Sequence, residues 1–277
     1  MSNRFRPAWL LVLAALSTSA LAKAPETVNI GYQKANIFAL LKYRGTLDES
    51  LKKQGIAVRW VEFPAGPQML EGLNVGSIDL AATGDAPPAF AQAAQADLVY
   101  LAHSPANPKT EAIVVPEQSK DITPVYLPPA DARAAFQRGA IDAWVIWDPF
   151  LAEVETNAKA RQIRNAEGLV PHYTFYLASR KFADTYPETA KQVVDELGKL
   201  SAWANSHQDE AAGLLSTSTG LDKAIWLKTL ARLPYGAERM TPAVYNEQQA
   251  LADTFTRIGL LPVKVDVRSA TWSLDKP

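Results

Sequence analysis

The chain has 277 residues, of which 48% are hydrophobic and 21% are charged, and its formal net charge is −1. A near-neutral chain without a basic stripe cannot displace counterions from phosphates, so this composition argues against nucleic-acid binding. Cysteine is absent. Thiol chemistry is therefore excluded, and the hydrophobic core must hold the fold without disulfides.

The first segment has the pattern of a secretory signal peptide. Arg4 and Arg6 precede an apolar run over residues 9–16, and small residues follow up to Ala22. The run is shorter than the roughly 20 residues of a membrane-spanning helix. The pattern predicts cleavage after Ala22, so that residues 1–22 are removed and the mature chain is exported to the periplasm. A buried amphipathic helix is the structural alternative.

Strand and helix patterns alternate through the first two thirds of the chain. The predicted strands are 27–32, 56–63, 78–83, 98–102, 111–115, 124–127, 141–147 and 174–179, and the predicted helices are 34–54, 68–74, 87–94 and 130–137. Repeated strand–helix units are typical of a parallel sheet covered by helices, so the sequence predicts an α/β fold. From Pro187 to Ile258 the pattern is helical. No long linker separates this part, and we expect its helices to pack onto the earlier sheet.

One ten-residue phrase occurs twice, as GSIDLAATGD at 76–85 and as GAIDAWVIWD at 139–148. Its glycine, its isoleucine and both of its aspartates recur 63 positions apart, and a proline-opened helix follows each copy. One interpretation is that Asp85 and Asp148 only cap the helices that follow them, each contributing about 1 kcal/mol.

The other interpretation makes both copies walls of one cleft. Ligands of open α/β sheets bind where the ends of strands lead into helices. Thr83, Gly84 and Asp85 would then form one wall, and Trp147 and Asp148 the other.

PAGPQML at 64–70 has the pattern of an anion site. With Gly66 at the cap and Pro67 at the first helical position, the N–H groups of Gln68 and Met69 stay free, and the positive end of the helix dipole favours an anion there. Gln33 follows the first predicted strand, where its amide can donate to the same anion. A plain structural turn fits these residues equally well.

Patterns of catalytic or metal-binding residues are missing. His103, His172 and His207 share no metal-ligand spacing with acidic neighbours and belong to no triad, and no nucleophile-elbow, zinc-protease or phosphate-loop motif occurs. We therefore expect a binding protein without a metal or a cofactor. An enzyme built on the same frame is the alternative from another class.

Several segments resemble the aliphatic sulfonate-binding family, whose members are the periplasmic solute-binding components of ABC importers and relatives of the taurine and nitrate binders. The resemblance runs from Val28 to Trp272 and is carried by GYQK (31–34), WVEFPAGPQMLEGLNVGSIDLAATGDAPPAFAQAA (60–94), ADARAAFQRGAIDAWVIWDPF (130–150), FYLASR (175–180) and KVDVRSATW (264–272).

The resemblance implies a two-lobed, type II periplasmic solute-binding fold. Lobe 1 would comprise residues 28–108 and 180–277, and lobe 2 residues 109–179. It implies a monomer that binds a small anionic ligand, an aliphatic sulfonate, and docks to an ABC permease. The positions that match the cleft of the family are Gln33, Gly66, Gln68, Thr83, Gly84, Trp147 and Asp148.

The sequence departs from the family after EAIVVPEQS. The family continues with a strand, a serine-rich turn and a helix, whereas here Ser119 leads through Lys120 to DITPVYL. Loss of these residues, about 40 in number, would shorten lobe 2, remove a strand from its sheet and leave backbone groups unpaired. Three functions stay open: a sulfonate binder, a binder of a related anion such as taurine or nitrate, and an internally deleted copy that has lost binding.

Overall fold

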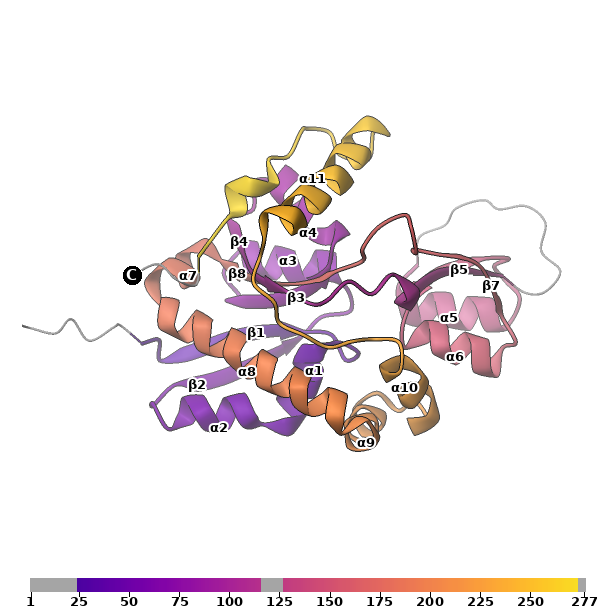
Figure 1. Ribbon diagram of the computed structural model, residues 1–277, viewed down its shortest axis with the longest axis horizontal. Helices are drawn as coiled ribbons and strands as arrows, with labels where there is room; N and C mark the ends of the chain where they lie inside the picture. Colours follow the sequence, from indigo (N-terminus) through magenta and orange to yellow (C-terminus); the bar gives the residue numbers. More distant parts are fainter. Residues whose placement is uncertain (1–23, 116–126, 274–277) are drawn as a thin grey trace, which may run out of the picture.

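Two β-sheets of different size organise the chain (Figure 1). The computed structural model describes residues 24–115 and 127–273, so the predicted signal peptide and most of the predicted strand 124–127 lie outside the described residues. The larger sheet has the order β2-β1-β3-β8-β4 and the smaller one the order β6-β5-β7. We call the part built on the larger sheet lobe 1 and the part built on the smaller sheet lobe 2.

The sheet of lobe 1 is mixed rather than purely parallel. β1 pairs in parallel with β2 and β3, whereas β8 runs antiparallel to β3 and β4. The predicted parallel sheet is therefore wrong for β8, which enters from lobe 2 in the opposite direction. The strands are β1 (Thr27–Tyr32), β2 (Ala57–Glu62), β3 (Leu80–Gly84), β4 (Leu98–His103) and β8 (Thr174–Ser179).

Helices cover both faces of this sheet. Leu80 and Ala82 of β3 belong to one hydrophobic core and Ala81 to the other, because neighbouring strand residues point to opposite faces. In Figure 1 α8 and α2 lie below the sheet, and α4 and α11 above it. The first layer contains α1 (Ile37–Arg44), α2 (Thr46–Lys52), α8 (Pro187–Ser206) and α9 (Gln208–Thr219), and the second α3 (Gly66–Asn74), α4 (Ala86–Ala93) and α11 (Pro242–Arg257).

The predicted helix 34–54 is divided in two. Gly45 has φ 69°, in the left-handed region that favours glycine, and its N–H bonds the carbonyls of Leu41 and Lys42. α1 therefore ends there and α2 begins at Thr46. The predicted helices after residue 187 are confirmed by α8 to α11, of which α10 spans Lys223–Leu230. The short helix α7 (Arg180–Thr185) precedes α8, and the 3₁₀ turn η2 (Val267–Ala270) follows α11.

Lobe 2 is a small antiparallel sheet with helices on one face. β5 (Glu111–Val115) lies between β6 (Trp144–Trp147) and β7 (Arg161–Asn165) and is antiparallel to both. α5 (Pro129–Gln137) and α6 (Phe150–Asn157) cover one face and share a core with the inward residues of β5 and β6. The sequence did not predict β7, because RQIRN has only one apolar residue.

The opposite face of this small sheet is open among the described residues. Val145 is 58% exposed and Ile163 50% exposed, whereas Trp144 and Ile146 of the same strand as Val145 are buried. A sheet with both faces covered would bury all of these side chains. As far as residues 109–115 and 127–173 show, lobe 2 thus has two layers, whereas lobe 1 has three.

Two crossover segments, residues 104–110 and 166–173, join the lobes side by side. Ser104 N–H donates to Thr174 O at 2.8 Å, and Asn107 N–H donates to Pro171 O at 3.0 Å. The first crossover ends in the 3₁₀ turn η1 (Pro108–Thr110). β8 already belongs to the sheet of lobe 1, so the chain returns before Thr174, not after Ser179 as the predicted boundary would have it.

The repeated phrase builds the same local structure in each lobe. Gly76 follows α3 with φ 74°, and Gly139 follows α5 with φ 72°. Each glycine ends a helix in the left-handed conformation and leads into a strand that is followed by another helix. The two aspartate-ended loops are therefore equivalent positions of the two lobes.

The open face of lobe 2 predicts a difference between two neighbouring residues. Val145→Lys is expected to change the free energy of unfolding by no more than about 0.5 kcal/mol, because the side chain stays in solvent. Ile146→Ala, the matched control from the buried face, is expected to cost about 2–5 kcal/mol. Denaturant titration of both variants measures this, and an equal loss in Val145→Lys would mean that the face is covered.

Candidate functional site

The N-terminus of α3 presents amide donors at one end of the lobe 1 sheet. The helix begins at Gly66 after the cap residue Ala65, with Pro67 in its first turn. In the described part of the chain, the N–H groups of Gly66 and Gln68 donate to no protein acceptor. Free amides at the positive end of a helix form a site for an anion.

The prediction for Met69 is wrong. Its N–H donates to Ala65 O at 3.3 Å, because the helix begins one residue earlier than expected. Its side chain is fully buried. A Cβ atom at Gly31 would lie 2.9 Å from Met69 Cγ, so Met69 fixes α3 against β1 and does not line a site.

The loop between β3 and α4 lies directly against this helix end. A Cβ atom at Gly66 would come within 2.8 Å of Pro87 Cγ and 3.4 Å of Thr83 Cβ. Only glycine permits this approach, which brings two of the predicted site segments together. The hydroxyl of Thr83 donates to Gly84 O at 3.1 Å.

Two amide side chains complete the lobe 1 half of the site. Gln33 Nε2 lies 3.4 Å from Pro64 O, beside the loop that leads into α3. Asn36 Nδ2 donates to Ala82 O at 3.2 Å and thereby connects the start of α1 to the end of β3. Gln33, Gly66, Gln68, Thr83 and Gly84 therefore lie around the ends of β1, β2 and β3, and their role in binding a ligand stays a prediction.

Asp85 occupies the cap position of α4 but makes no side-chain cap hydrogen bond. The interpretation as a simple cap is therefore wrong for Asp85. Burial raises the pKa of its carboxyl group. Its backbone oxygen accepts from Gln248 Nε2 of α11 at 2.7 Å, a contact that fixes the loop. Gln248 is a positioning residue that no sequence pattern indicated.

Trp147 and Asp148 stand at the end of β6 in lobe 2, and their environments differ. Trp147 is 36% exposed and pairs across the strands with Glu111. Asp148 is buried, and its Oδ1 accepts from Ala152 N–H at 3.0 Å. Asp148 therefore accepts from an N–H of the first turn of α6, as the cap interpretation expects, although the cap position itself is Pro149. Trp147 alone of these two presents its side chain to solvent.

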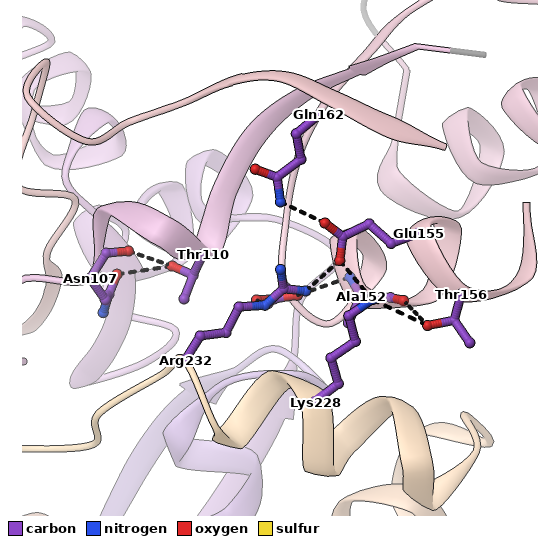
Figure 2. Close-up of polar contacts among 9 residues, drawn as sticks. Asn107, Thr110, Ala152, Glu155, Thr156, Gln162, Lys228 and Arg232 are labelled. Atoms are coloured by element: carbon purple, nitrogen blue, oxygen red, sulfur yellow. Dashed lines mark hydrogen bonds and ion pairs between the residues drawn. The ribbon is translucent and has the colours of Figure 1, made fainter. Parts of the chain in front are cut away.

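Asp148 is also bound by a cation from lobe 1. Arg232, which follows α10, forms an ion pair with Asp148, with Nε 2.8 Å from Oδ2. Its Nη2 donates to Asp148 Oδ1 and to Glu155 Oε2, each at 3.0 Å. Lys228 of α10 bonds Glu155 at 2.9 Å. Figure 2 shows both bases reaching Glu155 of α6 from the same side. This network ties the lobes together and occupies the Asp148 carboxylate, so Asp148 is not free to contact a ligand.

A second ion pair, which the sequence analysis missed, joins the second crossover to the start of β5. His172 Nδ1 is 2.7 Å from Glu111 Oε2. Burial disfavours the imidazolium, but the hydrogen bond to Glu111 and the charges of Glu111, Asp85 and Asp148 outweigh it and raise the pKa of His172. The loops of Asp85 and Asp148 are thus close enough to act on one ring. A lone histidine without a motif carried no signal for this role.

Metal-binding clusters and membrane-spanning helices are both missing from residues 24–115 and 127–273. In these ranges no cluster of three or more histidine, aspartate or glutamate side chains is arranged to hold a metal ion. No helix in them has the length and apolar character needed to cross a bilayer.

Comparisons with known proteins agree on one relationship. Residues 112–216 match the model of the NMT1-like family. An aliphatic sulfonates-binding protein of Escherichia coli (strain K12) is 38% identical, with 94% of this chain and 93% of the relative covered. A second protein of that description, from Bacillus subtilis (strain 168), is 27% identical over 89% of this chain and 86% of its own length.

Solved structures extend the agreement to the fold. The alkanesulfonate-binding protein SsuA from Xanthomonas axonopodis pv. citri, bound to MOPS, superposes with a TM-score of 0.84 at 37% identity, covering 91% of this chain and 99% of that one. The periplasmic aliphatic sulphonate binding protein SsuA from Escherichia coli gives 0.82 at 37% identity, covering 90% and 93%.

The fold is therefore that of the periplasmic solute-binding proteins, α/β proteins that bind and do not catalyse. Within this class, the chain belongs to the aliphatic sulfonates-binding protein family.

The buried Asp148 predicts a pH dependence. Burial raises its pKa from 3.8 to about 7, although Arg232 acts to lower it. The folded state then holds this proton more tightly than the unfolded chain, so stability is lost as pH rises through this range. The loss falls between the ordinary pKa of 3.8 in an unfolded chain and the folded value of about 7, and at 1.36 kcal/mol per pKa unit about 1–3 kcal/mol disappears between about pH 5 and pH 7.

Unfolding measured across this pH range tests the assignment. Asp148→Asn is expected to flatten the decline of the unfolding free energy with pH, whatever its effect on absolute stability. Asp142→Asn, which removes an exposed carboxylate from the same repeat, is expected to retain the wild-type slope. An unchanged slope in Asp148→Asn would contradict the assignment.

Proposed function

We propose that the mature protein binds an aliphatic sulfonate between its two lobes in the periplasm and delivers it to an ABC permease. The name of the Escherichia coli relative and the MOPS molecule in the Xanthomonas structure support this ligand class. The observation that carries the proposal is the pair of unpaired amides, of Gly66 and Gln68, held against the β3–α4 loop.

The chemistry of this half-site suits a sulfonate. The sulfonate head group keeps its negative charge and three acceptor oxygens. It therefore needs hydrogen-bond donors rather than a base. Neutral amides at a helix N-terminus supply them without adding a buried cation that would itself require a partner. Gln33 adds a side-chain donor, and the half-exposed ring of Trp147 offers an apolar surface to the alkyl chain from lobe 2. Asp148 acts indirectly, by fixing α6 and Arg232.

Two finer points belong to the same proposal. We place the first boundary between the lobes after residue 108, as the sequence predicted, and the second before Thr174 rather than after Ser179, because β8 pairs with β3 and β4 in the sheet of lobe 1. The mature protein begins after the cleavage expected at Ala22, and it acts as a monomer.

We further propose that lobe 2 is shorter than in the relatives. The comparison with the Escherichia coli protein extends over 300 positions, whereas 94% of the 277 residues is about 260, which leaves about 40 positions without a counterpart here. The open face with Val145 and Ile163 supports the same view. A shorter lobe 2 favours one alternative function, a copy that has lost ligand binding.

A thermal-shift experiment separates binding from its loss. A ligand at 100 times its Kd stabilises by about 2.7 kcal/mol, and at about 2–4 °C per kcal/mol the melting temperature should rise by about 5–10 °C. Taurine, short alkanesulfonates, MOPS, sulfate and nitrate are the ligands to screen, in buffers without a sulfonate group. A cooperative melt that none of them shifts would contradict the proposal and favour the binding-defective copy.

Substitution at the helix end tests the site itself. Gln68→Pro removes the backbone N–H that is proposed to bind the ligand, and it is expected to weaken sulfonate binding severalfold with little change in the melting temperature of the free protein, because the first turn of a helix tolerates proline and the side chain is exposed. Asn74→Ala, at the opposite end of the same helix, is the matched control and should bind like the wild type. Equal affinity in both variants would place the ligand elsewhere.

A further inference from the structure

His172 lies where the two crossovers meet. Its carbonyl oxygen accepts from Asn107 N–H of the first crossover at 3.4 Å, and its ring bonds Glu111 of β5. The residue has φ 56°, a left-handed conformation that asparagine, aspartate and histidine adopt more readily than other side chains. The ring is thus fixed from both segments, and its side chain is only 16% exposed.

Glu111 contacts this ring, and the charges of Asp85 and Asp148 also act on it. Acidic groups from three elements therefore influence His172. Glu111 belongs to β5, Asp85 precedes α4, and Asp148 follows β6. Asp148 is already neutralised by Arg232. With Asp148 set aside, the carboxylates of Asp85 and Glu111 and the ring of His172 remain. The two carboxylates then share a single cation, the imidazolium of His172.

The helix end that carries the free amides is connected to this environment through the β3–α4 loop. Asp85 follows Gly84 directly, and the loop of both residues lies against Gly66. Charges this close interact strongly in a partly buried site. With a neutral ring, an entering sulfonate would meet two uncompensated carboxylates. With a protonated ring, it would meet a cluster whose net charge is less negative by one.

Other bases near these strand ends are already paired. Arg232 bonds Asp148 and Glu155, and Lys34, which is 55% exposed, bonds Glu62 at 3.4 Å. His172 is therefore the buried base whose protonation changes the charge that faces the ligand. The raised pKa of its ring agrees with this geometry.

Building on the proposed function, we propose that His172 is a specificity-determining residue of the sulfonate site. Its imidazolium supplies the positive charge that allows an anion to bind beside Asp85 and Glu111, so that the ligand and the proton bind together. Affinity then falls as pH rises past the titration of the ring, and the protein prefers strong-acid anions, which remain ionised at the lower pH where the ring is charged.

Calorimetric titration of the full mature protein with ethanesulfonate between about pH 5.5 and pH 8.5 tests this inference. Buffers of different ionisation enthalpy, none carrying a sulfonate group, report proton uptake. The wild type is expected to lose affinity by up to about tenfold per pH unit above the titration of the ring, and to take up a proton on binding there. His172→Asn, which tolerates the left-handed backbone, should bind weakly, with a smaller pH dependence and a smaller proton uptake than the wild type, because the titration of Asp148 near pH 7 remains.

Two further variants separate this role from a structural one. His207→Asn removes an exposed histidine that stacks on Trp203 at the far end of α8, and it should retain the wild-type pH profile. Glu111→Gln removes the partner of the ring and should move the pH midpoint of binding downward. This shift decides the question even if His172→Asn does not fold.

The results that would contradict the role of His172 differ from those that would contradict the proposed function. Absence of binding at every pH would contradict the proposed function itself. Binding whose affinity is independent of pH in the wild type, or a pH profile that His172→Asn and Glu111→Gln leave unchanged, would overturn the role of His172 and leave the sulfonate proposal intact.

Discussion

The absence of a side chain at Gly66 is the constraint on which the site depends. A single methyl group there would lie 2.8 Å from Pro87 Cγ and would separate α3 from the β3–α4 loop. Gly31 plays the same part at the other contact of α3, where Met69 and Ile78 fill the space that a side chain would need. These two close contacts fix the free end of α3 at the edge of the sheet, so that its unpaired amides are held in place before any ligand arrives.

Charge pairing between the lobes is the second determinant of the structure. Arg232 connects the C-terminal part of lobe 1 to Asp148 and Glu155 of lobe 2, and His172 connects the crossovers to Glu111. These pairs occupy most of the charges near the strand ends. What remains for a ligand is a set of neutral donors beside a small acidic excess, which makes the protonation state of one histidine important for an anion.

The sequence predicted the parts of this account that depend on local chemistry. Strand patterns, the helix end after Pro64 and the equivalence of the loops at Asp85 and Asp148 all follow from short-range preferences. The contacts between distant segments did not follow: the antiparallel entry of β8, the pairing of Asp148 with Arg232 and the placement of His172 depend on which segments the fold brings together. Met69 was misassigned because the helix starts one residue earlier than expected, so that the N–H of Met69 already donates within the first turn. Sequence patterns do not predict the ends of a helix to within one residue.

The most direct test of the central claim is a crystal structure of the mature protein with ethanesulfonate. The account predicts that the sulfonate oxygens lie within hydrogen-bond distance of the backbone nitrogens of Gly66 and Gln68, with the ethyl group directed toward Trp147. A sulfonate bound by Arg232 or Lys34, with the amides of α3 bonded only to water, would contradict it.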